Sequence, residues 1–267
     1  MLQRPSEHSN LSREMFPYRI LDEVAHRPYP MPPRPWVMTQ SWHDLLFAHW
    51  PVGAHVMQSR LPAGLELDLW DDQAWLGVVP FHMTNVAPRG VPAMPWLSAF
   101  PELNVRTYVS VAGRPGVYFF SLDAGNRLAV AAARALFNLP YFSAAMSVEE
   151  QNGWIVYDHR RTSDAPPAEW KAHYRPVGSV HSAETGSLEY FLTERYCLYT
   201  VGRSNRAKRL DIHHPRWPLQ HAEADIAVNT MADAAGIRLP QAAPVLHFAK
   251  RQDVVAWLPV EASPNAG

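Results

Sequence analysis

Segments in which apolar and polar residues alternate make up most of the chain. Such alternation is typical of β-strands, because successive side chains of a strand point to opposite faces of its sheet. Turn-forming residues separate the segments, for example Asp71 and Asp72 and the run 113–116. The pattern predicts a meander of strands at 65–70, 74–83, 103–112, 116–122, 142–147, 153–160, 170–177 and 195–201.

Helical spacing of apolar residues interrupts this pattern in a few places. In the segment 39–51 the apolar residues recur at helical spacing, and Pro51 can end a helix there. An alanine-rich stretch follows Asp123, which is a candidate N-cap. The predicted helices span about 39–51, 126–137, a short stretch from Ser187, and 222–235.

The remaining segments are connections and ends. Four prolines and one glycine between Val86 and Pro101 predict a long connection, of the kind that often covers a site. Two apolar runs near the end, 245–249 and 254–259, predict a closing hairpin. The expected organisation is a Pro-rich N-terminal leader over 1–37, one domain over 38–260 and a disordered tail over 261–267.

Composition narrows the classes of function. The 267 residues carry a formal charge of -1, which gives no long-range field to recruit nucleic acid or an acidic membrane. The single cysteine cannot form an intramolecular disulfide, and the N-terminus has no apolar run of signal-peptide length. We therefore expect a soluble, cytoplasmic protein that binds neither nucleic acid nor membrane, and we leave a homo-oligomer open.

The segment 102–109 contains the most informative candidate site. As a strand, it has one polar face made of Glu102, Asn104, Arg106 and Tyr108, and one mainly apolar face. If the polar face points inward, Arg106 can bind a carboxylate or enolate oxygen and Glu102 can exchange a proton, so both are candidate catalytic residues. Asn104 and Tyr108 would then orient the ligand. The alternative is that this face meets water, the ordinary arrangement of an antiparallel sheet.

Three further residues are ligand-binding candidates that also have a structural interpretation. Ser121 and Asp123 can line the same cavity, although a serine or aspartate just before a helix is more often a cap. His82 lies between Phe81 and Met83, where a hydrogen-bonded structural histidine is the commoner role.

Other groups of reactive side chains are interpreted as structural. Adjacent histidines on a strand face opposite ways, so His213 and His214, even with His221 nearby, are expected to hold no metal. Cys197 lies in an apolar run and is expected to be a buried, inert thiol. The basic run 203–209 is expected to form an exposed hairpin. The nucleotide-binding and hydrolase motifs are absent from the sequence, so no cofactor is expected.

Several segments, in order, carry a family resemblance: LPAGLELD, AWLGVVPFHM, PELNVRTYV and GVYFFSLDA, then an alanine-rich helix and LPY, and later FLTERYCLYT and HHPRWPLQHAE. Over about residues 38–260 the chain resembles the YqjF-like family of the acetoacetate decarboxylase-like superfamily. The resemblance implies a conical antiparallel β-barrel that encloses a small-molecule cavity. It also implies a stretch that carries a Schiff-base lysine, but the matching residues 134–140 contain none. Arginine cannot replace it as an amine nucleophile. A Schiff-base mechanism is therefore excluded unless a lysine from elsewhere in the chain, Lys171, Lys208 or Lys250, reaches the cavity.

The sequence thus predicts a mainly β (α+β) protein, a single antiparallel acetoacetate decarboxylase-like β-barrel with a cavity and a few flanking helices. The function hypothesis is binding of a small anionic or carbonyl-bearing organic molecule, with acid–base catalysis through Glu102 and Arg106. One alternative is a non-catalytic ligand-binding or sensing protein on the same fold. Another is a protein-interaction module, which would show a large exposed apolar patch and no interior pocket.

Overall fold

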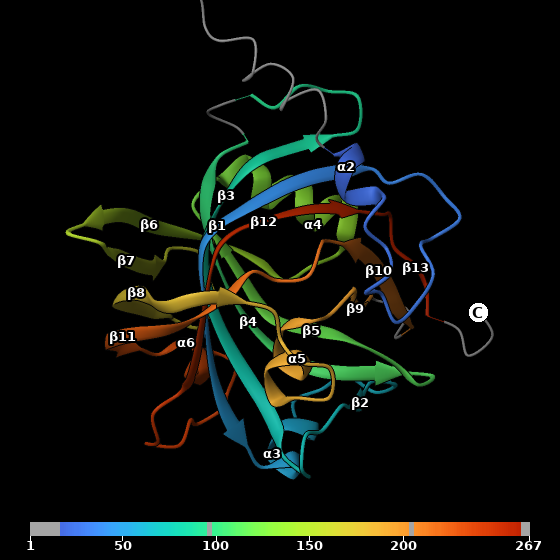
Figure 1. Cartoon of the computed structure of the whole chain (residues 1–267). Helices are drawn as coiled ribbons and strands as arrows, with labels where there is room; N and C mark the ends of the chain where they lie inside the picture. Colours follow the sequence, from blue (N-terminus) through green and yellow to red (C-terminus); the bar gives the residue numbers. More distant parts are fainter. Residues whose placement is uncertain (1–16, 95–97, 203–205, 263–267) are drawn as a thin grey trace, which may run out of the picture.

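Strands dominate the structure, a computed structural model that describes residues 17–94, 98–202 and 206–262 (Figure 1). The elements, in chain order, are α2 (Tyr18–Leu21), β1 (Met38–Val52), α3 (Ala54–Gln58), β2 (Glu66–Leu67), β3 (Ala74–Pro88), β4 (Phe100–Val111), β5 (Arg114–Ala124), α4 (Arg127–Phe137), β6 (Tyr141–Gln151), β7 (Trp154–Arg161), β8 (Glu169–His181), α5 (Leu188–Thr193), β9 (Cys197–Val201), β10 (Ala207–His213), β11 (Leu219–Asn229), α6 (Met231–Ala234), β12 (Val245–Ala256) and β13 (Val260–Glu261).

The strands form one sheet with the order β13-β10-β9-β5-β6-β7-β8-β11-β12-β1-β3-β4-β2. Two additional pairings, β5 with β4 and β10 with β12, join strands that are distant in this order. The pairings therefore form two closed circuits. One runs through β12, β1, β3, β4, β5, β9 and β10, and the other returns from β5 to β12 through β6, β7, β8 and β11. Strands β1, β3 and β4 form a wall shared by both circuits.

The sheet is mixed, so the expectation of a purely antiparallel sheet is wrong. Strand β5 runs parallel to both β6 and β9. Parallel neighbours need a crossover connection, and helix α4 provides it between β5 and β6. Asn126 caps this helix by accepting hydrogen bonds from the backbone N–H groups of Leu128 and Ala129. Asp123, the expected cap, lies within β5.

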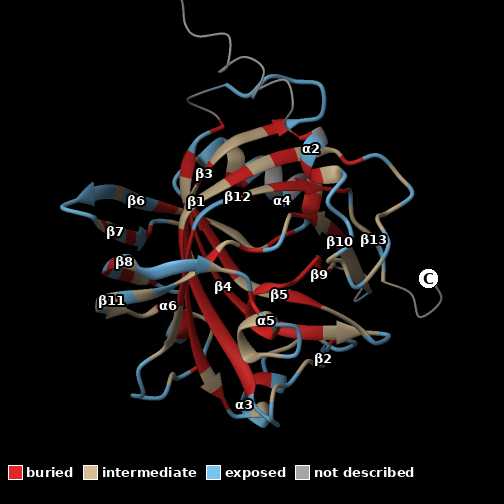
Figure 2. Ribbon diagram, viewed as in Figure 1, coloured by how far each residue is buried: buried red, intermediate tan, exposed pale blue. Residues whose placement is uncertain are grey.

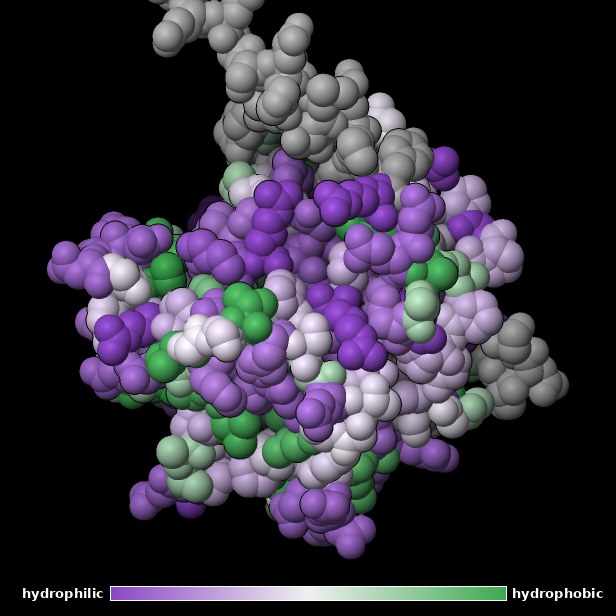
Figure 3. Space-filling model, viewed as in Figure 1, coloured by the Kyte–Doolittle hydropathy of each residue, from purple (hydrophilic) through white to green (hydrophobic). Residues whose placement is uncertain are grey.

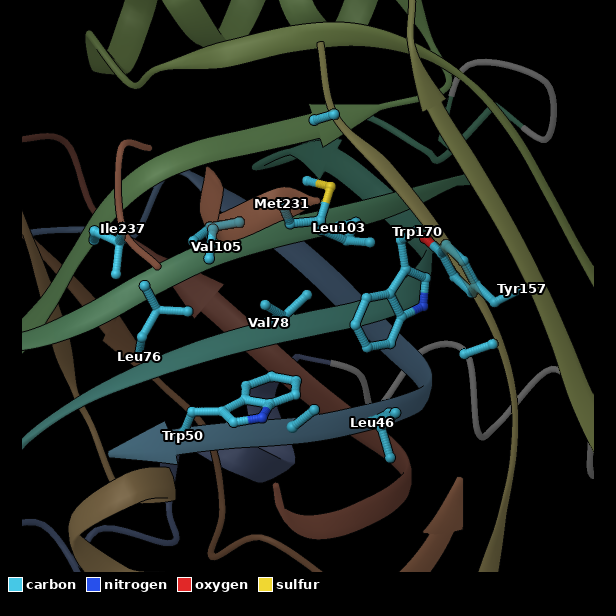
Figure 4. Close-up of a cluster of buried hydrophobic side chains, with 14 of the residues drawn as sticks. Leu46, Trp50, Leu76, Val78, Leu103, Val105, Tyr157, Trp170, Met231 and Ile237 are labelled. Atoms are coloured by element: carbon cyan, nitrogen blue, oxygen red, sulfur yellow. The ribbon is translucent and has the colours of Figure 1, made fainter. Parts of the chain in front are cut away.

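The shared wall is buried on both faces (Figure 2). Leu103 and Val105 of β4 face an apolar core that also takes side chains from β7 and β8. Burial of each large apolar side chain stabilises the fold by about 1.5–3 kcal/mol. Figure 4 labels ten members of this core, Leu46, Trp50, Leu76, Val78, Leu103, Val105, Tyr157, Trp170, Met231 and Ile237.

Residues 39–51 lie in strand β1, so the helix predicted there is wrong. Residues 45–50 are all buried, because both faces of the wall are covered. Asp44 has a φ of 49° and lies at a register shift between His43 and Ala48. The irregularity breaks the period of two, and successive apolar residues then resemble a helical stripe.

Two expectations near the C-terminus are also wrong. The helix predicted over 222–235 is replaced by strand β11 and the four-residue helix α6. Exposed and half-buried residues alternate along β11, but its many alanines also fit helical spacing. The hairpin predicted over 245–259 is the single strand β12, because its expected turn at 251–253 pairs directly with β1.

The described part of the N-terminal leader packs against the domain. Ile20 and Trp36 are buried in a cluster with Val255 and Trp257 of the C-terminal region. This segment is therefore held by burial of apolar surface and is not a free tail over residues 17–37. Residues 1–16, and 263–267 of the expected C-terminal tail, lie outside the described residues.

Large apolar side chains are exposed at scattered positions. The two most exposed, Leu128 at 69% and Val180 at 61%, belong to α4 and β8. The face in Figure 3 is mainly hydrophilic, with small separate apolar areas. This distribution does not favour the interaction-module alternative. Among the residues that the structure describes, no helix has the length and apolar character needed to span a membrane.

Candidate functional site

A cavity of about 450 Å³ lies between the shared wall and strands β9 and β10. Its volume falls within the range of small-molecule sites, roughly 300–1,000 Å³. Helix α4 borders it, and two of its lining residues, Pro88 and Leu128, are exposed and so mark the side open to solvent. Most of the lining is apolar and includes Phe81, Phe100, Phe119, Leu122, Leu198 and Trp217.

Three residues of the polar face of β4 line this cavity. Glu102, Asn104 and Arg106 are 3%, 5% and 8% exposed, so they do not form a solvated surface. They share a face because they are two residues apart, and Leu103 and Val105 between them face the core. The structure therefore brings both candidate catalytic residues to one cavity wall.

Glu102 is an acid that retains its proton at neutral pH. Burial raises the pKa of its carboxyl group to about 8; a hydrogen bond from Tyr141 opposes this shift and the charge of Asp123 adds to it. The Tyr141 hydroxyl donates to Glu102 Oε2 at 3.0 Å. Because pH 7 lies below this pKa, the neutral carboxylic acid predominates and can donate a proton or a hydrogen bond to a ligand oxygen.

Arg106 is a buried cation that forms no salt bridge with a described carboxylate. Its Nη2 donates to the carbonyl oxygen of Leu192 at 3.1 Å and to the hydroxyl of Tyr108 at 3.4 Å, whereas its Nε is buried without a partner. The Oδ1 atom of Asn104 is also buried and unpaired. Buried polar groups are unfavourable without partners. A ligand with an anionic group and a hydrogen-bond donor would satisfy both residues.

A second arginine, Arg195, reaches the cavity beside Arg106. Its guanidinium carbon lies 4.9 Å from the centre of the Tyr108 ring, and the hydroxyl of the same tyrosine contacts Arg106. Arg195 forms a salt bridge with Asp68 and donates from Nε to the Phe191 carbonyl at 2.7 Å. Sequence reasoning missed this arginine because it follows helix α5, far from β4 along the chain.

Two other cavity residues also come from distant segments. Tyr141 begins β6, and His214 follows β10. The sequence pattern around Tyr141 gave no sign of a partner for Glu102. His214 was considered only as a metal ligand.

Tyr108, Ser121 and His82 do not line the cavity. Tyr108 is fully buried behind Arg106, and its hydroxyl lies 2.7 Å from His49 Nε2 and 2.6 Å from the Leu192 carbonyl oxygen. It therefore supports Arg106. Ser121 is buried with an unpaired Oγ. His82 alternates with two cavity residues, so it points to the other face of β3 and stacks on His43 with ring centres 4.9 Å apart.

Asp123 also lies away from the cavity, in a buried ionic group. Its two carboxylate oxygens accept hydrogen bonds at 2.7 Å each from Nε and Nη2 of Arg161. The Nε2 atom of His159 lies 3.0 Å from the same carboxylate. All three side chains are buried, so the expected role of Asp123 as a ligand-binding residue or helix cap is replaced by a structural one.

No lysine is among the described residues that line the cavity. Lys171 and Lys250 are exposed and paired with carboxylates, and Lys208 of β10 is absent from the lining. The Cys197 thiol does line the cavity, but burial raises its pKa, so the thiol stays protonated at neutral pH.

The described residues contain no group of three His, Cys, Asp or Glu side chains placed to hold a metal ion. His213 and His214 point in different directions. The Nε2 atom of His213 lies 2.6 Å from the Ile20 carbonyl oxygen, whereas His214 lines the cavity.

Residues 39–253 match the model of the DUF2071 family, described as "Uncharacterized conserved protein (COG2071)". This chain belongs to that family. A relative, the uncharacterized protein YqjF of Bacillus subtilis strain 168, is 51% identical over 222 residues, which cover 83% of this chain and 91% of YqjF.

Solved structures with the same fold are acetoacetate decarboxylase-like. Acetoacetate decarboxylase from Legionella pneumophila matches with a TM-score of 0.58 at 13% identity, over 91% of this chain and 95% of the decarboxylase. The enduracididine biosynthesis enzyme MppR, in complex with the condensation product of pyruvate and imidazole 4-carboxaldehyde, matches with a TM-score of 0.59 at 11% identity, over 87% of this chain and 92% of MppR. At such low identity the similarity establishes the fold alone.

Proposed function

We propose that the cavity binds a small organic anion, specifically a carboxylic acid with an apolar body, and that Arg106 holds its carboxylate. The observation that carries this proposal is the buried Arg106 guanidinium, which has no described carboxylate partner and an unpaired Nε. A charge in such surroundings is favourable only when a counter-charge joins it. The closed circuit of strands then acts as a barrel around the ligand.

The geometry of β4 favours a ligand longer than a three-carbon acid. Glu102 and Arg106 are four residues apart, which corresponds to roughly 13 Å along a strand. A carboxylate at Arg106 therefore meets Asn104 first, and a carbonyl or hydroxyl oxygen reaches Glu102 only at the far end of the molecule. The apolar and aromatic lining between these polar points suits an aliphatic or aryl body.

Acid–base catalysis without a Schiff base is consistent with the same groups. The protonated Glu102 can donate a proton to a carbonyl or enolate oxygen while Arg106 holds the carboxylate. The MppR structures include a complex with pyruvate, and the other neighbours include decarboxylases of acetoacetate, so the similar folds accommodate keto acids. The alternative is binding without turnover, in which these groups only orient the ligand.

A matched pair of ligands tests the proposal. We expect 2-naphthylacetate to bind to the purified protein at least about tenfold more tightly than 2-naphthylacetamide, which has the same body but no charge; the difference corresponds to one charge-assisted hydrogen bond. Isothermal titration calorimetry at about pH 7 measures both. Equal affinities would contradict an anion site. Proton NMR of the acid incubated with the protein in D₂O would reveal exchange or turnover and so separate the catalytic from the non-catalytic form of the proposal.

Affinity for the acid is expected to fall as the pH rises through about 8. Burial raises the pKa of Glu102 to about 8, so its carboxyl is neutral below that pH and negative above it. A negative Glu102 repels an anionic ligand within the cavity. Calorimetric titrations between about pH 7 and pH 9 should show this decline in the unmodified chain. Glu102→Gln cannot ionise and should show no decline; a decline that persists in this variant would assign it to another group.

A further inference from the structure

Helix α5 holds both arginines of the cavity through its last carbonyl groups. The Phe191 carbonyl oxygen accepts from Arg195 Nε at 2.7 Å, and the Leu192 carbonyl oxygen accepts from Arg106 Nη2 at 3.1 Å. The next residue, Thr193, lines the cavity itself. The position of this short helix therefore determines where both guanidinium groups point.

At the other end of α5, Glu189 is held by histidines of the sheet. Its Oε1 atom lies 2.8 Å from Nε2 of His181 in β8 and 3.2 Å from Nε2 of His247 in β12. His221 of β11 completes the group, with its ring centre 5.4 Å from that of His181 and 6.4 Å from that of His247. Three adjacent strands thus each contribute one histidine, of which two contact the Glu189 carboxylate and the third packs against both rings. We call His181, Glu189, His221 and His247 the histidine cluster.

His49 connects the histidine cluster with the surroundings of Arg106. His49 is fully buried and touches the hydroxyl of Tyr108, which in turn contacts Arg106. Burial holds the pKa of His49 well below its ordinary value, and the charges of Arg106 and His247 lower it further. The charges of Arg106 and of His247 therefore both reach this one buried residue. A proton added to the cluster would add positive charge on the side of His49 away from the ligand, near an arginine that has no described carboxylate partner.

We propose that the histidine cluster couples proton uptake to anion binding in the cavity, with α5 as the connecting element. Protonation of a histidine strengthens its ion pair with Glu189, which fixes α5 and with it the carbonyl groups that hold Arg106 and Arg195. The added positive charge also favours an anion at Arg106. A bound anion raises the proton affinity of the cluster by the same factor, because linkage is reciprocal. This inference rests on the proposed function, that the cavity binds an organic anion.

Histidine is suited to this role because it titrates between about pH 5 and pH 8. Burial lowers the pKa of His247; the charge of Glu189 opposes this, and the charges of His221 and His181 add to it. Protonation of His247 in the empty protein therefore needs a lower pH than that of an ordinary histidine. The bound anion would move that protonation towards neutrality.

Other titratable groups lie near the cavity, and their contributions to the pH dependence of binding must be distinguished from that of the histidine cluster. Glu102 ionises near pH 8, so a Glu102→Gln background removes its contribution. His214 lines the cavity, and burial lowers its pKa. Asp68 is paired with Arg195.

The test measures binding of naphthalene-2-sulfonate, which remains an anion at every pH used. Calorimetry is performed from about pH 7 to pH 5.5 in the Glu102→Gln background, with EDTA so that the histidines hold no metal. We expect affinity to rise at least about fivefold as the pH falls. Glu189→Gln keeps a hydrogen-bond acceptor but removes the charge, so it should bind within about twofold of its parent at pH 7 and show a flat profile. His247→Gln removes a titratable ring and should flatten the profile as well.

Glu184→Gln is the matched control, because Glu184 lies exposed just before α5 and the change in charge is the same. It should retain the full pH dependence. A parent that binds the sulfonate with no pH dependence would overturn the coupling and leave the proposed function intact. A pH dependence retained in both Glu189→Gln and His247→Gln would show that the histidine cluster is not its source and would overturn the coupling. Failure of the sulfonate to bind at any pH would instead count against the proposed function.

Discussion

Arg106→Gln is expected to weaken binding of 2-naphthylacetate by roughly ten- to hundredfold. A hydrogen bond between charged partners contributes about 1.5–3 kcal/mol, and each 1.4 kcal/mol corresponds to a factor of ten in affinity. Glutamine retains an amide donor, but it has no charge and cannot form the bidentate hydrogen bonds that a guanidinium group makes with a carboxylate. The loss should be measured by calorimetry near pH 7, where Glu102 is neutral and does not compete for the cation.

Two controls make this result specific. Arg175→Gln makes the same change at an exposed arginine that pairs with Glu223 and lies away from the cavity, so it should bind the acid normally. The neutral 2-naphthylacetamide should bind to Arg106→Gln and to the unmodified chain with similar affinity. The thermal stability of Arg106→Gln without ligand should not fall, because the substitution removes an unpaired buried charge. If the acid binds to Arg106→Gln with unchanged affinity, the anion site lies elsewhere.

Asp123→Ala is expected to lower the free energy of unfolding by about 3–5 kcal/mol, the usual effect of removing one partner of a buried ion pair. The substitution leaves the Arg161 guanidinium and the His159 ring buried without their carboxylate. Urea denaturation followed by tryptophan fluorescence measures the change. Asp158→Ala, at the exposed residue beside His159, should change stability by less than about 0.5 kcal/mol.

The destabilisation by Asp123→Ala should also depend on pH. Burial acts to raise the pKa of Asp123, but hydrogen bonds from His159 and Arg161 outweigh it and hold the pKa below its ordinary value of 3.8. A carboxyl group with a lowered folded-state pKa stabilises the fold above its unfolded pKa, and this contribution is lost as the pH falls through the folded pKa. The two proteins should therefore converge in stability below about pH 4. A constant difference down to about pH 2 would show that packing, and not charge, is responsible.

A double substitution measures the interaction between Asp123 and Arg161 apart from their contacts with other residues. Asp123→Leu combined with Arg161→Met removes both charges together, so it should be less destabilising than Asp123→Ala alone. Together with the single variants Asp123→Leu and Arg161→Met it forms a double-mutant cycle, in which the coupling energy reports the ionic interaction. A double variant as unstable as the sum of its single variants would mean that the two side chains do not interact.

The cavity lacks the lysine that the Schiff-base mechanism implied by the family resemblance requires. Each lysine of the sequence is described, and none lines the cavity. Its lining instead includes a neutral carboxylic acid and two arginines, which suit proton transfer and anion binding rather than amine catalysis. We therefore propose that the cavity of this fold binds its ligand through Glu102, Arg106 and Arg195 and without a lysine.

The sequence by itself determined that strand β4 has one polar face. Glu102, Asn104 and Arg106 share a face for a local reason, since the period of a strand depends only on its backbone geometry. The absence of a lysine from 134–140 was likewise visible without a structure. Both conclusions needed no knowledge of neighbouring strands.

Only the tertiary structure decided that this face points into a cavity, which residues meet it there, and that 39–51 and 222–229 are strands. Arg195 and Tyr141 reach the cavity from segments far along the chain, and Asp123 is ion-paired because β7 brings Arg161 beside it. Strand β1 resembles a helix in sequence because both of its faces are buried and its alternation breaks at Asp44. A local sequence pattern reflects the periodicity of the backbone. Whether a strand is buried on both faces, and which distant charged residue lies beside it, depend on how the strands pair to close the sheet.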